Sequence, residues 1–149
     1  WGYGLRVVAP SRGGKMLQKI EIVYKDQYYD VTLTVKQGTF ADGIRRAALQ
    51  GESLLAGPIE GMLENLSVLI TQWIRPSCLA GLASVENRGE HEIKPEPTLE
   101  EFMEYPDALI ELWQNTVWEL NPHWSPFGTR PTQQNSLTEN SLDGTPQKE

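Results

Sequence analysis

The sequence predicts an α+β fold that is mainly helical, with an N-terminal antiparallel β-hairpin packed on about four helices. Apolar residues alternate with polar ones between residues 17 and 36, whereas between residues 40 and 120 they recur three and four positions apart. After Phe127 the chain turns to Pro, Thr, Gln, Asn and Ser. A segment of that composition buries too little surface to offset its ordering entropy, so a disordered C-terminal tail is expected.

The 149 residues suit a single domain, which we place at residues 16–124, with the tail at residues 125–149. Residues 1–15 are expected to lie outside that domain, either as an upstream in-frame extension or as a flexible leader. The first methionine is Met16, and the codons for Arg12-Gly13-Gly14-Lys15 can spell a bacterial ribosome-binding sequence. Translation is therefore hypothesised to begin at Met16, and the N-terminal mass of the native protein would test this.

Two strands are predicted from alternation with a period of two. In the first strand Ile20, Ile22 and Tyr24 share one face, and a polar turn at Lys25-Asp26-Gln27 follows it. The second strand alternates polar residues with Tyr29, Val31, Leu33 and Val35. A lone hairpin is marginal in water, so its apolar face is expected to pack on the helices that follow.

Two helices are predicted in the middle of the chain. The first begins at an N-cap, Thr39, and ends at Gly51. Its apolar positions at helical spacing are Phe40, Ile44, Ala47 and Ala48. The second opens at Gly57-Pro58, has the most regular apolar spacing in the chain, and is expected to end at Arg75-Pro76.

Two more helices are predicted near the C-terminal end. A short one begins at the capping box of Thr98 and Glu101, and a longer one begins at Pro106 and ends at Asn121. Residues 84–97 between the two pairs are charged, contain prolines and show no period, which predicts an exposed loop.

Charge and composition exclude several classes of protein. Lys and Arg number 13 against 20 Asp and Glu, so the formal net charge is -7. A chain of this sign repels phosphate backbones, and no binding to nucleic acid is expected. No apolar stretch reaches the roughly 18 residues that span a bilayer, so no membrane partner is expected. The only cysteine, Cys78, cannot form an internal disulfide, and a cytoplasmic location is expected.

No catalytic residue, cofactor or metal ion is expected. His91 and His123 lack further ligands at the spacing of a metal site. Cys78 follows a predicted helix C-terminus, where the dipole disfavours a thiolate, so a buried apolar role is predicted for it. Carboxylate pairs such as Glu100 and Glu101 are typical of a solvated helix face in an acidic protein. The protein is therefore expected to be no enzyme and to act by binding other proteins.

An aromatic cluster near the C-terminal end is the candidate protein-interaction site. Its residues, with one leucine, are Tyr105, Leu109, Trp113, Trp118, Trp124 and Phe127. Trp113 and Trp118 are five positions apart on a predicted helix, so their directions differ by about 140°. One can therefore lie in the core while the other contacts a partner, as Trp often does at interfaces. Packing of all these rings into one core is the alternative.

The order of elements and one late segment resemble the tail assembly chaperones of long-tailed bacteriophages. The residues that carry the resemblance are Leu99, Glu100, Glu101, Phe102, Pro106, Leu109 and Trp113, continuing into Glu119-Leu120-Asn121-Pro122. The resemblance covers roughly residues 16–124. It implies a helper that is absent from the virion, binds the helical tape measure protein in the bacterial host cytoplasm and helps to recruit tail-tube subunits.

Other functions stay open at this point. The protein could be a structural or neck protein retained in the virion, a small regulatory module with one tight host partner, or an enzyme whose site the sequence does not reveal. Self-association into a homo-oligomer is compatible with each of them. Proteomics of purified virions would separate a structural protein from a helper.

Overall fold

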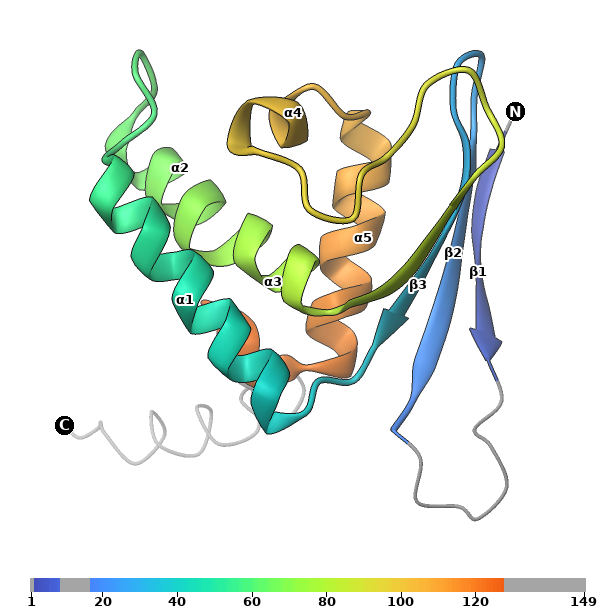
Figure 1. Ribbon diagram of the computed structural model, residues 1–149, viewed down its shortest axis with the longest axis horizontal. Coiled ribbons are helices and arrows are strands. Elements are labelled where there is room, and N and C mark those ends of the chain that lie inside the picture. The colour runs from blue at the N-terminus through green and yellow to red at the C-terminus, as the bar shows by residue number, and fades with distance from the viewer. Residues whose placement is uncertain (1, 9–16, 128–149) are drawn as a thin grey trace, which may run out of the picture.

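The computed structural model of the protein describes residues 2–8 and 17–127, and it contains an antiparallel sheet of four strands (Figure 1). In spatial order the strands are β1 (Gly2–Val8), β2 (Lys19–Lys25), β3 (Asp30–Lys36) and β4 (Leu82–Asn87). Helices cover one side of this sheet. The predicted α+β class is therefore confirmed.

The helical segments form two further layers beside the sheet. They are α1 (Phe40–Ala56), α2 (Glu64–Val68), the π-helix η1 (Leu69–Ile74), α3 (Arg75–Ala80), α4 (Leu99–Met103), α5 (Asp107–Leu120) and the 3₁₀ turn η2 (Pro122–Trp124). Helix α5 contacts β2 and β3, whereas α1 contacts α3 and η1. Figure 1 shows the result, with α1 on the side of the helices that is turned away from the sheet.

The predicted hairpin is present as β2 and β3, with Ile22 opposite Leu33 and Tyr24 opposite Val31. These four side chains are buried, as the alternation predicts. The turn depends on Asp26, whose carboxylate accepts hydrogen bonds from three groups. The donors are the Tyr24 hydroxyl at 2.7 Å and the backbone amides of Tyr28 and Tyr29 at 2.8 and 2.7 Å.

Strands β1 and β4 extend the hairpin on either side. Strand β4 pairs with β3, so the prediction that residues 84–97 form a loop is wrong for their first part. Its alternation is broken because the pairing register shifts between Thr34 and Val35, so that Leu82 and Val85, three positions apart, both turn toward the core. Strand β1 belongs to residues 1–15, which were expected to lie outside the domain, and it pairs with β2. Initiation at Met16 stays a prediction, since Met16 lies outside the described residues.

Three helix boundaries differ from the prediction. Helix α1 continues through Gly51 to Ala56. The next helix begins at Glu64 instead of Pro58, because the chain first makes a loop in which Gly57 and Gly61 have positive φ. The helical stretch was expected to end at Arg75-Pro76, but it continues past Pro76 to Ala80. Pro76 lies near the start of α3, directly after the π-helical segment η1. Proline lacks the amide that an α-helix needs, and a π-helical turn is one way to accommodate it.

The core lies between the sheet and α5. Its largest completely buried side chains include Ile22, Leu33, Leu79, Leu109 and Trp113. Helix α3 closes one end of it, with Cys78 and Leu79 buried. None of the 17 residues of α1, all of which the structure describes, is buried. The outermost helix therefore contributes no fully buried side chain to the core, against which Leu49 packs half-buried.

The link from β3 to α1 is anchored to the end of α5 by a buried asparagine. Asn121 accepts a hydrogen bond from the Gly38 amide at 2.7 Å, and its Nδ2 donates to the carbonyls of Lys36 and Val117. This fixes where α1 begins. Among the described residues, no helix combines the length and apolar character needed to cross a membrane. Of the predicted tail, residues 125–149, the structure describes residues 125–127 and not the rest.

Candidate protein-interaction surface

Helix α1 begins at a capping box. The Thr39 hydroxyl accepts a hydrogen bond from the Asp42 amide, and the Asp42 carboxylate accepts one from the Thr39 amide at 2.8 Å. Lys36 forms an ion pair with Asp42 at 3.1 Å. Partial burial raises the pKa of Asp42, but these hydrogen bonds and the Lys36 charge outweigh it and hold that pKa below its ordinary value.

The face of α1 that meets the body is mainly polar, although Leu49 packs half-buried against the core. Arg45 donates to the carbonyl of Leu79 at 2.7 Å, at the C-terminal end of α3. Gln50 donates to the carbonyl of Gln72 at 2.7 Å, and the Gln72 side chain returns a bond to the Gln50 carbonyl at 3.2 Å. In an α-helix the Gln72 carbonyl would accept the amide of residue 76, which is proline. Pro76 has no amide to donate, and the Gln50 side chain donates to this carbonyl.

Arg46 completes the polar contact. Its guanidinium lies over the rings of Trp73 and Trp124, at 5.4 and 5.7 Å from the two ring centroids, and it donates to the Trp124 carbonyl at 3.1 Å. Burial lowers the pKa of Arg46, although an arginine keeps its charge at any physiological pH. A cation–π contact at a partly buried site of this kind contributes roughly 0.5–2 kcal/mol.

Because the polar face is turned inward, the apolar face of α1 points into solvent. Phe40 is 85% exposed and Leu55 is 91% exposed. We call the apolar residues on this side the outer face of α1: Phe40, Ile44, Ala47, Ala48, Leu54 and Leu55, of which all six are exposed. The helix was predicted from the spacing of four of these residues, Phe40, Ile44, Ala47 and Ala48, but their exposure to solvent was not predicted. Monomers rarely leave a contiguous apolar patch in water unless something binds it.

The six residues predicted to form the interaction site are divided by the structure. Leu109, Trp113 and Trp124 are buried in the core. Tyr105 and Trp118 are half-buried, and Phe127 is 71% exposed. A buried side chain cannot touch a partner in this conformation, so only Tyr105, Trp118 and Phe127 can contribute to a docking surface.

The contacts of these aromatic rings explain the division. Trp113 packs against Phe102, with 5.9 Å between ring centroids. Trp118, on another side of α5, donates from its indole nitrogen to the Ser77 hydroxyl at 3.0 Å and lies edge-on to Phe127. Trp113, named as an interaction residue, is therefore a core residue, while Trp118 stays partly in contact with water, a division that the angle between them allows. The rings of Trp118 and Phe127 form a second and smaller apolar surface.

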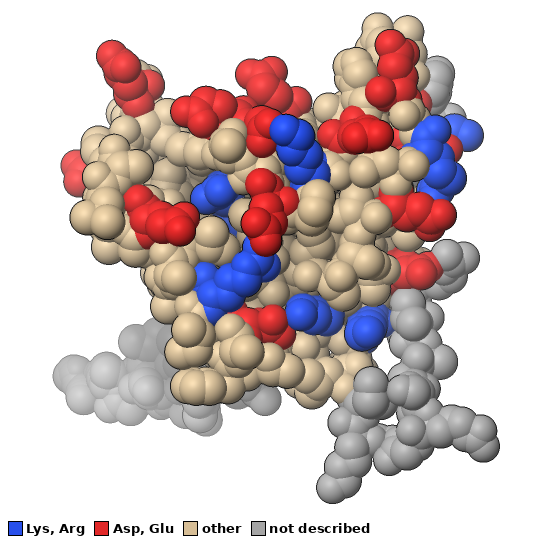
Figure 2. All heavy atoms as spheres, in the orientation of Figure 1, with Lys and Arg blue, Asp and Glu red and all other residues tan. Residues whose placement is uncertain are grey.

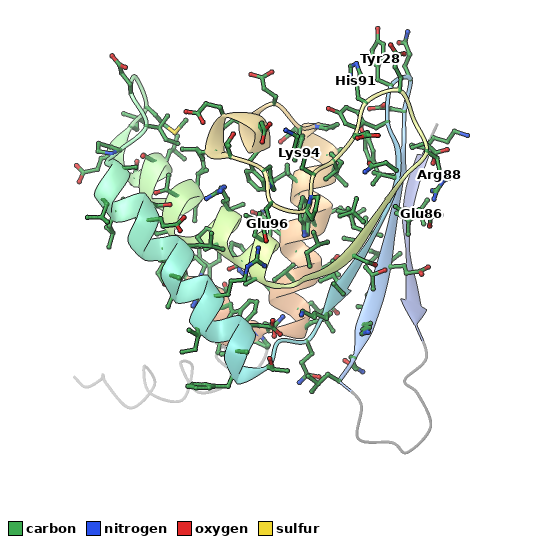
Figure 3. All side chains as sticks on the ribbon, viewed as in Figure 1. Tyr28, Glu86, Arg88, His91, Lys94 and Glu96 are labelled. Atoms are coloured by element: carbon green, nitrogen blue, oxygen red, sulfur yellow. The ribbon has the colours of Figure 1, made fainter. Side chains whose placement is uncertain are left out.

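The residues considered for chemistry are placed apart from one another. Cys78 is buried, as predicted, and burial raises the pKa of its thiol well above the usual range. Figure 3 shows His91 beside Tyr28, where the two rings stack at 4.9 Å at the β2–β3 turn. His123 is exposed next to Trp124. Among the described residues, no three His, Cys, Asp or Glu side chains cluster as metal ligands do.

Two hollows flank the helix made of α2 and η1. A groove of about 190 Å³ lies between α1 and α2, with Leu54, Val68 and Glu64 on its walls. A wider hollow of about 500 Å³ lies on the other side, between η1, α4 and α5, and includes Met103 and Ile110. Comparisons with protein families, with curated proteins and with solved structures give no match to this chain.

Proposed function

We propose that the protein is not an enzyme and that it binds another protein through the outer face of α1. One observation carries this proposal: α1 is docked by Arg45, Arg46 and Gln50, so its apolar residues face water. Burial of apolar surface contributes about 25 cal/mol per Å², and a partner that covers this face would gain that energy without any rearrangement of the domain.

Within this class we propose the particular role of a tail assembly chaperone of a long-tailed bacteriophage. The resemblance around Leu99–Trp113 supports this role, with the tape measure protein as the client and tail-tube subunits as a second partner. A holding chaperone needs apolar surface for its client's helices and net charge that keeps the complex in solution. A chain with a net charge of -7 and an exposed apolar helix face combines both properties. Its place of action would be the cytoplasm of the bacterial host.

The test is co-expression of the full chain with a candidate tape measure protein from the same genome, followed by pull-down and a binding titration. The double substitution Phe40→Ser with Ile44→Ser is expected to weaken client binding at least about tenfold, as the loss of interface anchors does. Both side chains are exposed in the monomer, so the free energy of unfolding should change by less than about 1 kcal/mol.

Two further variants make the result specific. Leu5→Ser removes an exposed leucine from β1 and should leave client binding unchanged. Phe127→Ser tests the smaller surface of Trp118 and Phe127. If the Phe40/Ile44 variant binds the client as well as the native chain does, the outer face of α1 is not the docking site. If the native chain itself fails to bind any tape measure protein, the chaperone role is abandoned.

A further inference from the structure

The end of the molecule where α1 turns into α2 is both apolar and open to solvent. Leu54 and Leu63 are each 70% exposed. We call this region the distal surface; it consists of Leu54, Leu55, Leu63, Leu66 and Val68, all exposed. Leu54 and Val68 line the groove of about 190 Å³ between the two helices. Because that groove is small, it has room for one aliphatic side chain and not for a whole polypeptide segment.

The segment that forms the distal surface carries only acidic charge, although Glu52 lies in a separate hollow beside Arg45 and Arg75. Between residues 47 and 74 the chain has no Lys, Arg or Asp, and its charged residues are Glu52, Glu60 and Glu64. On the face that Figure 2 shows, acidic and no basic side chains lie over the α1–α2 loop. Glu60 and Glu64 form no ion pair with any described residue, and Glu64 lies on the wall of the groove. A partner with positive charges beside an apolar stripe complements this pattern.

The elements that frame the groove restrict the partner's conformation. Helices α1 and α2 and the loop at Gly57-Pro58 frame the groove, and no strand of the described sheet borders it, so an extended peptide has no strand edge there to which it could add. A segment that binds there must satisfy its own backbone hydrogen bonds, as an α-helix does. A second copy of the chain is disfavoured, because a twofold interface through the distal surface would place the acidic residues Glu60 and Glu64 on both sides of it.

We propose that the distal surface binds an amphipathic helix whose apolar stripe is bordered by Lys or Arg. The proposal rests on the proposed function and adds the chemistry of the client segment. One aliphatic side chain of that helix occupies the groove between Leu54 and Val68, and its basic residues pair with Glu60 and Glu64. Charge selects this class of helix, while apolar contact provides most of the affinity.

The experiment uses two synthetic helical peptides with the same leucine stripe, one with lysine at its polar positions and the other with glutamate. Titration into the full-length protein should show binding of the lysine peptide at least about tenfold tighter than that of the glutamate peptide. Raising the ionic strength from about 0.01 M to about 1 M, where the screening length falls to about 3 Å, should reduce that difference.

The double substitution Glu60→Gln with Glu64→Gln should weaken the lysine peptide by about tenfold and lower its salt dependence. Glu90→Gln with Glu119→Gln is the matched control, because it removes the same charge from exposed sites on other elements. Equal affinity for the two peptides, or equal effects of the two double variants, would overturn the basic-helix proposal and leave the chaperone role standing. Binding of the native chain to a tape measure protein tests that role independently.

Discussion

Gly38, in the link between β3 and α1, lies directly against the ring of Trp124. A Cβ atom built on Gly38 would lie 2.7 Å from two ring atoms of Trp124 and 3.3 Å from the Cβ of Asp42. The Trp124 ring cannot easily retreat, because Arg46 lies over it. The absence of a side chain at position 38 therefore sets the distance between the start of α1 and the body.

Gly38→Ala is expected to lower the free energy of unfolding by roughly 1–3 kcal/mol, since it forces the Trp124 ring out of place. Gly51→Ala is the matched control. Nothing lies within 4 Å of a Cβ at Gly51, and alanine in place of a helical glycine should raise stability by roughly 0.5–1 kcal/mol. Chemical denaturation followed by tryptophan fluorescence measures both. Equal stability of the two variants would show that the Trp124 ring adapts to the added methyl group.

At the scale of elements, helix α1 shows what local pattern can and cannot predict. The spacing of Phe40 and Ile44 predicts that they share a face of a helix, and they do. Whether that face meets the body depends on carbonyls that lie more than 20 residues away, at Gln72 and Leu79. Strands β2 and β3 were easier to predict, because an alternating strand has only two faces and one must be buried.

The candidate site was hard to predict because the burial of its side chains depends on residues that are distant in the sequence. Trp113 and Trp118 were correctly separated by their angle on α5, since both positions belong to one helix. The burial of Trp124 could not be derived from its own neighbours, because its ring is covered by Arg46 from α1 and packs beside Gly38. Leu54 and Leu55 were missed because the helix was predicted to end at Gly51, whereas it continues to Ala56.

The capping box of α1 makes the stability of this helix dependent on pH. The folded pKa of Asp42 is below its ordinary value of 3.8, so its contribution is complete above that value and is lost as the pH falls through the depressed pKa. Asp42→Asn should therefore destabilise the protein at neutral pH and have less effect in acid. Denaturation of both proteins over the acidic range measures this. A constant difference at every pH would mean that the Asp42 charge contributes nothing.

At the scale of the whole molecule, the fold has two parts with different kinds of cohesion. The sheet and α5 are joined by side chains that are completely buried, such as Ile22, Leu33 and Leu109. Helix α1 is joined to α3 and η1 by side chains that bond to backbone carbonyls and by Arg46 on two indole rings. Polar contacts to the surface of a packed body open at lower free energy than a core does.

Arg46→Lys tests this division directly. Lysine keeps the charge but loses the planar guanidinium that stacks on Trp73 and Trp124 and reaches the Trp124 carbonyl, so α1 should open more easily by roughly 1–2 kcal/mol. Hydrogen exchange should accelerate in α1 and stay unchanged in β2, β3 and α5. Arg88→Lys is the control, since Arg88 lies exposed at the sheet edge beside Asp30 and should leave α1 protection unaltered. If Arg46→Lys instead accelerates exchange equally in α1 and α5, α1 and the core unfold as a single unit. The outer face of α1 would then be presented to a client by a rigid helix and not by one that can detach.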